Sequence, residues 1–353
     1  MISKKKKVVV GLSGGVDSTV TAKILKDKGF EVVGVFFENF DNAEGVKSAQ
    51  KAAESLEIEF KTVDVKDFFE KNVRQKFYQD ILDGKTPNPC VDCNKVFKFG
   101  YFLDIAKEKL EADFFATGHY VKIYKNKQTD QFELKIPKDL ANDQTYFLHK
   151  LSQDQLKNIL FPLADLTKDE VRELAKKAGF PNFDKKSSSD ICFLKDENYA
   201  DFVRKNFTKK TGKIIDFESG KVLGNHDGSI FFTIGQRKNL GIGGIKGFPE
   251  KPFFVVKKDH KENIVYVSQN EELLSVSEIV INNLSFVSGE IPEVNENLEA
   301  KIRFRTKNRR CKIIKNSEKK LVVQFEEPVF APAAGQFCVF YNKDVCLGGG
   351  EIV

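Results

Sequence analysis

The stretch Gly11-Leu12-Ser13-Gly14-Gly15-Val16-Asp17-Ser18 decides the fold class of this 353-residue chain. It stands between an apolar strand pattern over residues 7–12 and a helical pattern over residues 16–28. Paired glycines let a backbone approach an anion closely, and the amides of the next helix's first turn point at bound oxygens. The hydroxyls of Ser13 and Ser18 add further donors. The stretch therefore predicts a phosphate-binding loop.

The glycine pattern of this loop differs from the patterns of two common phosphate-binding loops. No Lys follows the final glycine, as a Walker A loop requires, and G-x-G-x-x-G is absent. A plain glycine turn would account for the glycines but not for the two serines and Asp17. Asp17 is a candidate ligand for Mg²⁺, which prefers a carboxylate together with phosphate oxygens.

Strand and helix patterns alternate outward from the loop. Apolar strands are expected at 31–37, 59–65 and 113–116, and helices at 43–57, 67–82, 96–110 and, after a capping box at Thr167, to Gly179. Continuous apolar strands joined by helices predict an α/β domain with a doubly wound parallel sheet covered on both faces. Ligands of such sheets bind at the carboxyl ends of the strands, where Ser13 and Gly118 fall.

Near residue 200 the sequence pattern changes from alternating strands and helices to short strands and turns. We expect an α/β domain over residues 1–200, a small β-rich domain over 201–272 and a second β-rich domain over 273–353. The strands expected in these last two domains are 213–217, 229–233, 253–257, 264–268, 298–304 and 321–325.

Composition excludes several classes of protein. Hydrophobic residues make up 41% and charged residues 31%, which argues against a disordered, collagen-like or membrane protein. Apolar stretches stay well short of the roughly 18 to 20 residues of a transmembrane helix. The lysines of residues 4–7 mimic a signal peptide, but the apolar run after them breaks at Gly11, so we expect a cytoplasmic protein without a membrane partner.

The charge balance permits a polyanionic partner. There are 57 Lys and Arg against 51 Asp and Glu, a net charge of +6. Eight of the fifteen residues in 301–315 are Lys or Arg, and none is acidic. This run is either a solvated edge strand or a nucleic-acid contact.

The six cysteines fall into two groups. Cys311, Cys338 and Cys346 lie in strand-like contexts and are expected to be packing residues. Cys90 and Cys93 follow the stiff Thr86-Pro87-Asn88-Pro89 segment and open a helix, whose N-terminus lowers a thiol pKa. With Lys95 nearby, Cys93 is expected to be a thiolate at neutral pH.

The C-x-x-C pair is compatible with three kinds of site: a redox pair, half of a zinc site, or part of an iron–sulfur site. No second C-x-x-C or H-x-x-x-H completes a zinc site. Cys192 follows the polar run Ser187-Ser188-Ser189-Asp190, and this segment alone favours a small buried thiol.

An ordered set of motifs resembles the tRNA-specific 2-thiouridylase family over most of the chain. The motifs are S-G-G-V-D-S from Ser13, T-P-N-P-x-x-x-C-N-K from Thr86, A-T-G-H-Y from Ala116, N-D-Q-T-Y-F-L from Asn142, D-I-C-F from Asp190 and G-Q-R-K-N-L-G-I-G-G from Gly235. The resemblance implies an ATP-pyrophosphatase (PP-loop) domain, a central adaptor domain and a C-terminal β-barrel. It also implies that ATP activates the C2 oxygen of a tRNA wobble uridine, which sulfur then replaces.

The resemblance also assigns roles to residues of this chain. ATP would lie at Gly11, Leu12, Ser13, Gly14, Gly15, Val16, Asp17 and Ser18, with Phe37 near the adenine and Gly118 closing the site. Cys192 would carry sulfur as a persulfide delivered by a cysteine desulfurase or a sulfur relay, and Cys93 would release it, with a transient disulfide between the two. The tRNA would contact Asn88, Pro89, Cys90, His119, Asn142, Asp143, Gln144, Arg303, Phe304, Arg305 and Gln336.

Two positions depart from the family pattern, because Cys90 stands where Asp is frequent and Asn142 where Lys is common. Three thiols, Cys90, Cys93 and Cys192, leave a 4Fe-4S cluster open as an alternative to the persulfide. Two rival functions remain: an amidating ligase of the same superfamily, which would not need the thiols, and a non-catalytic RNA-binding protein, against which the intact loop argues.

Overall fold

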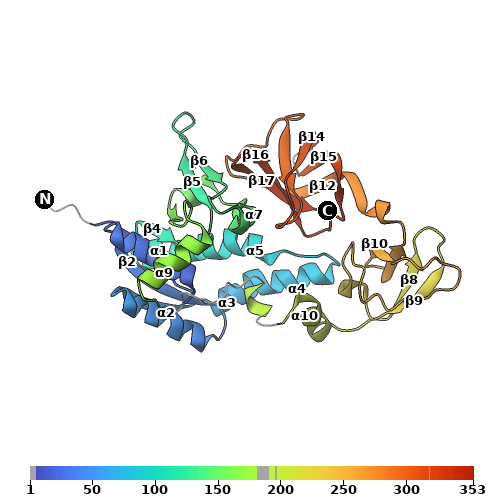
Figure 1. Ribbon diagram of the computed structural model, residues 1–353, viewed down its shortest axis with the longest axis horizontal. Helices are drawn as coiled ribbons and strands as arrows, with labels where there is room; N and C mark the ends of the chain where they lie inside the picture. Colours follow the sequence, from blue (N-terminus) through green and yellow to red (C-terminus); the bar gives the residue numbers. More distant parts are fainter. Residues whose placement is uncertain (1–4, 181–190, 195–196, 318) are drawn as a thin grey trace.

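The computed structural model describes residues 5–180, 191–194, 197–317 and 319–353. Figure 1 shows three parts: a sheet with its helices, a barrel beside it, and a small β domain at the end of the molecule away from the N-terminus. Within the described ranges, none of the helices has the length and apolar character needed to cross a membrane.

The N-terminal part is built on a parallel sheet. Its strands, in the order β3-β2-β1-β4-β7, are β3 (Glu59–Asp64), β2 (Glu31–Glu38), β1 (Lys7–Gly11), β4 (Phe114–Ala116) and β7 (Ile159–Leu160). Val8 and Val10 of β1 pack in one apolar cluster, and Val9 packs in another. Both faces of the sheet are therefore buried, which confirms the predicted doubly wound fold.

Helices on each face follow the predicted pattern closely. One face carries α1 (Val16–Asp27), α2 (Ala43–Ser55) and α9 (Lys168–Lys177), and Thr167 and Glu170 form the expected capping box. The other face carries two nearly continuous helical runs. These are α3 (Lys66–Phe69), η1 (Glu70–Arg74) and α4 (Gln75–Leu82), then α5 (Pro89–Asp92), η2 (Cys93–Tyr101), α6 (Phe102–Asp104) and η3 (Ile105–Lys109).

Shorter elements connect this domain to the rest of the chain. They are η4 (Leu140–Asn142), α7 (Thr145–Leu148), α8 (Gln153–Leu156), η5 (Cys192–Leu194) and α10 (Tyr199–Asn206).

The central β domain contains a sheet in the order β10-β11-β8-β9. The strands are β8 (Gly212–Asp216), β9 (Val222–His226), β10 (Phe254–Asp259) and β11 (Ile264–Ser268). The strand expected at 229–233 is wrong: Ser229–Phe231 is a 3-10 turn, η6. The backbone N–H of Ser229 donates to the side chain of Asn263 at 2.9 Å, so it is not available to a neighbouring strand.

The C-terminal domain is a closed barrel, because the first and last strands of its six also pair with each other. The strands, after η7 (Glu271–Leu274), are β12 (Ser275–Phe286), β13 (Leu298–Lys301), β14 (Arg309–Ser317), β15 (Lys320–Phe330), β16 (Phe337–Asn342) and β17 (Val345–Ile352). Cys311, Cys338 and Cys346 are buried in or against it, as predicted for packing residues.

A hairpin from the N-terminal domain extends the barrel sheet. Strands β5 (Lys122–Lys125) and β6 (Phe132–Lys135) pair with each other, and β6 pairs antiparallel with β17. The hairpin stands beside the barrel in Figure 1. The barrel is therefore joined to the nucleotide-binding domain by backbone hydrogen bonds as well as by side chains.

Candidate functional site

The two serines of the glycine-rich loop make hydrogen bonds within the loop itself. The Ser13 N–H donates to Ser18 Oγ at 3.2 Å, and Ser18 Oγ–H donates to the Gly15 carbonyl at 3.0 Å. Gly14 has a φ of +74°, and a Cβ there would lie 2.7 Å from Ser48 Oγ. Gly15, the N-cap residue of α1, has no side chain to cap the helix, and its own N–H donates to Ser13 Oγ at 3.4 Å. The remaining first-turn amides of α1 are therefore candidate donors to a phosphate.

Asp17 of this loop is engaged by two side chains that the sequence reasoning did not identify. Lys168 Nζ donates to both carboxylate oxygens at 2.6 Å, and the Tyr120 hydroxyl donates to Oδ1 at 2.9 Å. Lys168 is the first residue of α9, and its side chain is only 11% exposed. The capping box at Thr167 located this helix start, but only the fold brings it to the loop. Lys168 thus compensates the charge of Asp17, and a Mg²⁺ ion at Asp17 would share the carboxylate with Lys168 through its remaining lone pairs.

Loss of the Lys168 ammonium is expected to weaken ATP binding. In Lys168→Met the carboxylate of Asp17 would stand uncompensated beside incoming phosphates, so we expect the Kd for ATP to rise by about tenfold or more. Calorimetry with a non-hydrolysable ATP analogue measures this. Lys122→Met is the matched control, because Lys122 pairs with Asp165 at the surface. An unchanged Kd in Lys168→Met would contradict the prediction.

Gly118 lies directly against the loop. A Cβ at this position would come within 2.8 Å of Asp17 Cβ and 3.0 Å of the Ser18 nitrogen. Phe37, at the carboxyl end of β2, is buried and stacks on Phe102 with ring centroids 3.6 Å apart. Its ring belongs to the core, and its contact with adenine stays a prediction.

The thiols of Cys90 and Cys93 lie at the start of the helical run that begins at Pro89. Burial raises the pKa of Cys90 to about 11 and that of Cys93 to about 12. The prediction of a Cys93 thiolate in the unliganded protein is therefore contradicted, since desolvation outweighs the opposing charge of Lys98. That charge belongs to Lys98 and not, as predicted, to Lys95; Lys95 Nζ donates to Gln155 Oε1 at 3.0 Å.

Cys192 is exposed, unlike the buried thiol that its segment alone favoured. It opens η5, where the next residue, Phe193, packs its ring on Phe69 and Phe77, and a side-chain hydrogen bond links Cys192 to Asn39. The preceding serine run lies outside the described residues. The charge of Cys192 acts on both Cys90 and Cys93, so folding brings together thiols that are 99 positions apart (192 − 93).

Lys98 provides the positive charge that acts on the thiol cluster, which consists of Cys90, Cys93 and Cys192. Its charge partly offsets the effect of burial on Cys90 and Cys93, and with burial it lowers the pKa of His119 well below the usual value. His119 hydrogen-bonds Thr117 through Nδ1 at 2.7 Å. Sequence reasoning missed Lys98, although it stands five residues after Cys93 on the same helix. Its charge therefore acts both on the thiols and on His119, the residue after Gly118.

The three thiols are not arranged as ligands of a single metal ion. In the part of the chain that the structure describes, which includes all three thiols, no three His, Cys, Asp or Glu side chains are placed to hold a metal ion. The 4Fe-4S cluster stays a prediction.

The raised pKa values predict slow alkylation of the buried thiols. A pKa raised in the folded state keeps the thiol protonated, so the iodoacetamide reaction of Cys93 should still accelerate above pH 9, where an unfolded thiol of pKa about 8.5 levels off. Lys98→Gln should slow it further, and Lys98→Arg should not. Residue-resolved mass spectrometry between pH 7 and 10 measures both effects. A rate that levels off near pH 8.5 would refute the prediction.

Three residues predicted to bind tRNA are engaged inside the protein. Asp143 is 5% exposed and accepts from Lys301 Nζ at 3.0 Å, and Gln144 Oε1 accepts from the Tyr120 N–H at 2.8 Å. Asn142 Nδ2 donates to Asp139. Contacts of these residues with tRNA stay predictions.

The basic segment differs from the expected strand over 298–304. Strand β13 ends at Lys301, and Arg303, Phe304 and Arg305 form the turn that follows. Arg303 donates to the Ala331 carbonyl at 2.6 Å, and the Phe304 ring packs on Phe147 with centroids 4.3 Å apart. Phe304 thus packs between domains, and its contact with tRNA stays a prediction.

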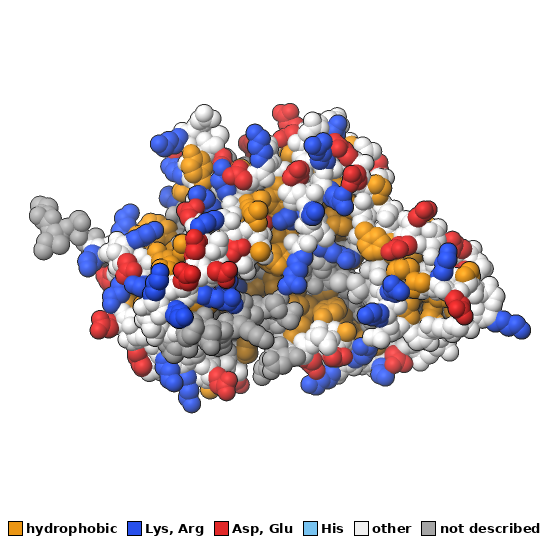
Figure 2. Space-filling view, in the orientation of Figure 1, with side chains coloured by type: hydrophobic (Ala, Val, Ile, Leu, Met, Phe, Trp, Pro, Cys, Tyr) orange, Lys and Arg blue, Asp and Glu red, His pale blue; other side chains and the backbone are white. Residues whose placement is uncertain are grey.

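On the face of the molecule that Figure 2 shows, surface charge does not outline an RNA-binding region, because blue and red side chains are interspersed there. Arg305 is exposed, whereas Gln336, also predicted to contact tRNA, donates through Nε2 to the Thr86 carbonyl at 2.7 Å.

Comparison with known domain families defines the class of protein. Residues 6–196 match the family described as tRNA methyl transferase HUP domain, residues 200–269 the tRNA methyl transferase PRC-barrel domain, and residues 276–352 the aminomethyltransferase beta-barrel domain. The chain is thus a HUP-domain protein that carries both accessory barrels.

Relatives identify the family within this class. The chain is 41% identical to tRNA-specific 2-thiouridylase MnmA 2 of Aliarcobacter butzleri, covering 99% of each chain. It is 43% identical to tRNA-specific 2-thiouridylase MnmA of Listeria monocytogenes, covering 98% of this chain and 94% of the relative. The chain belongs to the tRNA-specific 2-thiouridylase family, as the motifs indicated.

Solved structures resemble the chain more weakly. A 4-thiouridine synthetase in complex with RNA and ATP aligns with a TM-score of 0.36 and 19% identity over 55% of this chain and 46% of the other. A likeness of this strength carries no argument here.

Proposed function

We propose that this protein is a tRNA-uridine 2-sulfurtransferase that acts on a wobble uridine. One observation carries the proposal: Gly118 lies against the phosphate loop, and the charge of Lys98 acts both on His119 beside Gly118 and on the thiols of Cys90 and Cys93, which Cys192 also influences. Nucleotide activation and sulfur chemistry can therefore meet on one substrate atom. An amidating ligase of the same superfamily would have no use for the thiols.

The first step is adenylation of the uridine. The C2 oxygen attacks the α-phosphorus of ATP, the bond to the bridging oxygen breaks, pyrophosphate leaves, and the N3 proton is lost. The α1 amides and the serines of the loop would hold the pyrophosphate. Mg²⁺, with Asp17 as its protein ligand, would neutralise phosphate charge. Adenylation turns a poor leaving oxygen into the good leaving group AMP.

The second step is sulfur transfer. The terminal sulfur of a Cys192 persulfide attacks C2, and AMP departs with the oxygen. The Cys93 sulfur then attacks the Cys192 sulfur, which forms a disulfide and releases 2-thiouridine as N3 regains a proton. The two cysteines are oxidised as the transferred sulfur is reduced, so a thiol reductant must restore them. Because Cys192 is exposed, a desulfurase or relay protein could transfer sulfur to it. We place this reaction in the cytoplasm.

The test is an anaerobic incubation of the purified protein with unmodified tRNA, ATP, Mg²⁺, a thiol reductant, and a cysteine desulfurase with cysteine as the source of persulfide sulfur. Nucleoside digestion and mass spectrometry should detect 2-thiouridine only when ATP is present. Pyrophosphate release without a thionucleoside would show that the loop adenylates but that the proposed acceptor or sulfur donor is wrong.

A further inference from the structure

Three domains meet on residues 84–86. These residues lead into the base-facing segment, residues 86–93, which contains Asn88, Pro89 and Cys90, the residues that the resemblance places against the target base of the tRNA. From the central domain, Lys258 Nζ of β10 donates to the Gly84 carbonyl at 2.8 Å and to the Phe232 carbonyl at 2.9 Å. From the barrel, contacts reach both Lys85 and Thr86. The start of the base-facing segment is therefore attached to both accessory domains.

Lys85 bridges the N-terminal domain and the barrel. Its Nζ lies 3.1 Å from Asp80 Oδ1 of α4 and 2.7 Å from Glu351 Oε1 of β17. Glu351 is 5% exposed, and its other oxygen accepts from Asn283 Nδ2 at 2.8 Å. Because Glu351 is buried and accepts a hydrogen bond through each oxygen, its carboxylate is held in one position. The ion pair therefore also fixes the position of the Lys85 ammonium.

The backbone of Thr86 is clamped from both sides. Its N–H donates to the Ala334 carbonyl at 2.8 Å, and its carbonyl accepts from Gln336 Nε2 at 2.7 Å. Gly335 between them has a φ of +88°, and a Cβ there would lie 3.0 Å from Lys85 Cβ. The barrel loop 334–336 thus contacts the main chain of Thr86. A shift of the barrel would therefore move this end of the segment directly.

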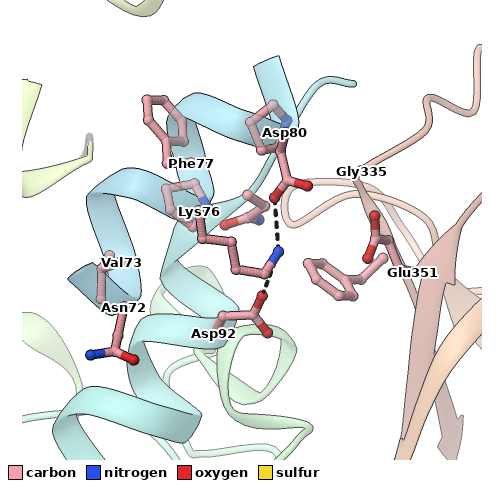
Figure 3. A pocket seen from close by; sticks show the side chains of 12 residues that line it. Asn72, Val73, Lys76, Phe77, Asp80, Asp92, Gly335 and Glu351 are labelled. Atoms are coloured by element: carbon pink, nitrogen blue, oxygen red, sulfur yellow. Dashed lines mark hydrogen bonds and ion pairs between the residues drawn. The ribbon is translucent and has the colours of Figure 1, made fainter. Parts of the chain in front are cut away.

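The far end of the segment is fixed within the N-terminal domain. Asp92 pairs with Lys76 at 3.3 Å and with Lys150 at 2.7 Å. Figure 3 shows Lys76 between Asp80 and Asp92, with Gly335 and Glu351 approaching from the barrel across a small pocket. Pro87 and Pro89 stiffen the chain between these two anchors, so displacement of Thr86 is carried to Asn88.

We propose that Glu351 and Gln336 are positioning residues through which the barrel sets the place of the base-facing segment, residues 86–93. This inference rests on the proposed function for its effect on catalysis. It also gives Gln336 a role different from direct contact with tRNA. Binding of tRNA to the barrel and capture of the base would then be mechanically linked through Lys85 and Thr86.

Hydrogen exchange tests the proposal without substrate. In Glu351→Gln and, separately, Gln336→Leu, amide exchange across residues 84–93 should accelerate by about tenfold or more, with the parallel sheet unchanged. Glu327→Gln is the matched control, because Glu327 pairs with Arg309 at the exposed surface of the same barrel. Unchanged exchange in both test variants would overturn the proposal.

Kinetics separate positioning from binding. The same variants should lower kcat for tRNA thiolation by about tenfold while the Kd for tRNA changes less than about threefold. In a cycle with Lys85→Met, the double variant Lys85→Met/Glu351→Gln should lose no more than the worse single variant. A proportional rise in Kd, or additive losses, would overturn the positioning role. Absence of 2-thiouridine from the wild-type reaction would instead overturn the proposed function, and hydrogen exchange would still decide the junction.

Discussion

Replacement of Cys192 by Ser is expected to abolish thiolation while adenylation continues. A serine hydroxyl cannot carry a sulfane sulfur, so 2-thiouridine formation should fall by more than about 1000-fold. The phosphate loop lies on separate elements, so tRNA-dependent pyrophosphate release should stay within about threefold of the wild type. Mass spectrometry of nucleosides and a pyrophosphate assay on the same reaction measure the two steps. Equal loss of both steps would contradict the separation.

The other two cysteines make this test specific. Cys93→Ser should also stop turnover, but with the tRNA left joined to Cys192 through the transferred sulfur, since the thiol that attacks Cys192 is missing. Cys90→Ala, prepared and assayed under strict anoxia, is the matched control, because the persulfide route gives Cys90 no covalent role. Its activity should stay within about tenfold of the wild type. Loss as severe as in Cys192→Ser would favour the 4Fe-4S cluster over the persulfide.

Replacement of Gly118 by Ala is expected to remove most nucleotide binding. The added methyl would meet the Cβ of Asp17 at 2.8 Å and the Ser18 nitrogen at 3.0 Å, and the latter is backbone that cannot swing away. Movement of the loop by a fraction of an ångström misplaces several donors at once. We expect the Kd for ATP to rise on the order of tenfold to hundredfold.

Calorimetric titration of ATP into Gly118→Ala measures this effect. Gly243→Ala is the control, because a Cβ at Gly243 meets no atom within 4 Å among the described residues. Thermal unfolding should show that both variants remain folded. Wild-type affinity in Gly118→Ala would mean that the loop is not the nucleotide site or that it yields without cost.

Much of the N-terminal fold could be predicted because its signals are local. The apolar runs of β1 and β2, the helical spacing of α1 and the capping box of α9 each depend on residues a few positions apart. The turn at Ser229 was missed because its conformation depends on Asn263, which is distant in sequence. The turn at Phe304 was missed because its ring packs on Phe147 of another domain.

The candidate site also combines features that could and could not be predicted from the sequence. Its chemical groups could be predicted, because a phosphate loop and a cysteine pair after stiff prolines are recognisable by residue type and spacing. Their electrostatic state and partners follow from the tertiary structure: Cys93 is buried and protonated, and Lys168 forms an ion pair with Asp17. Gln336 holds the backbone of Thr86. Desolvation and ion pairing depend on atoms from elements far apart in the chain, and no local pattern encodes them.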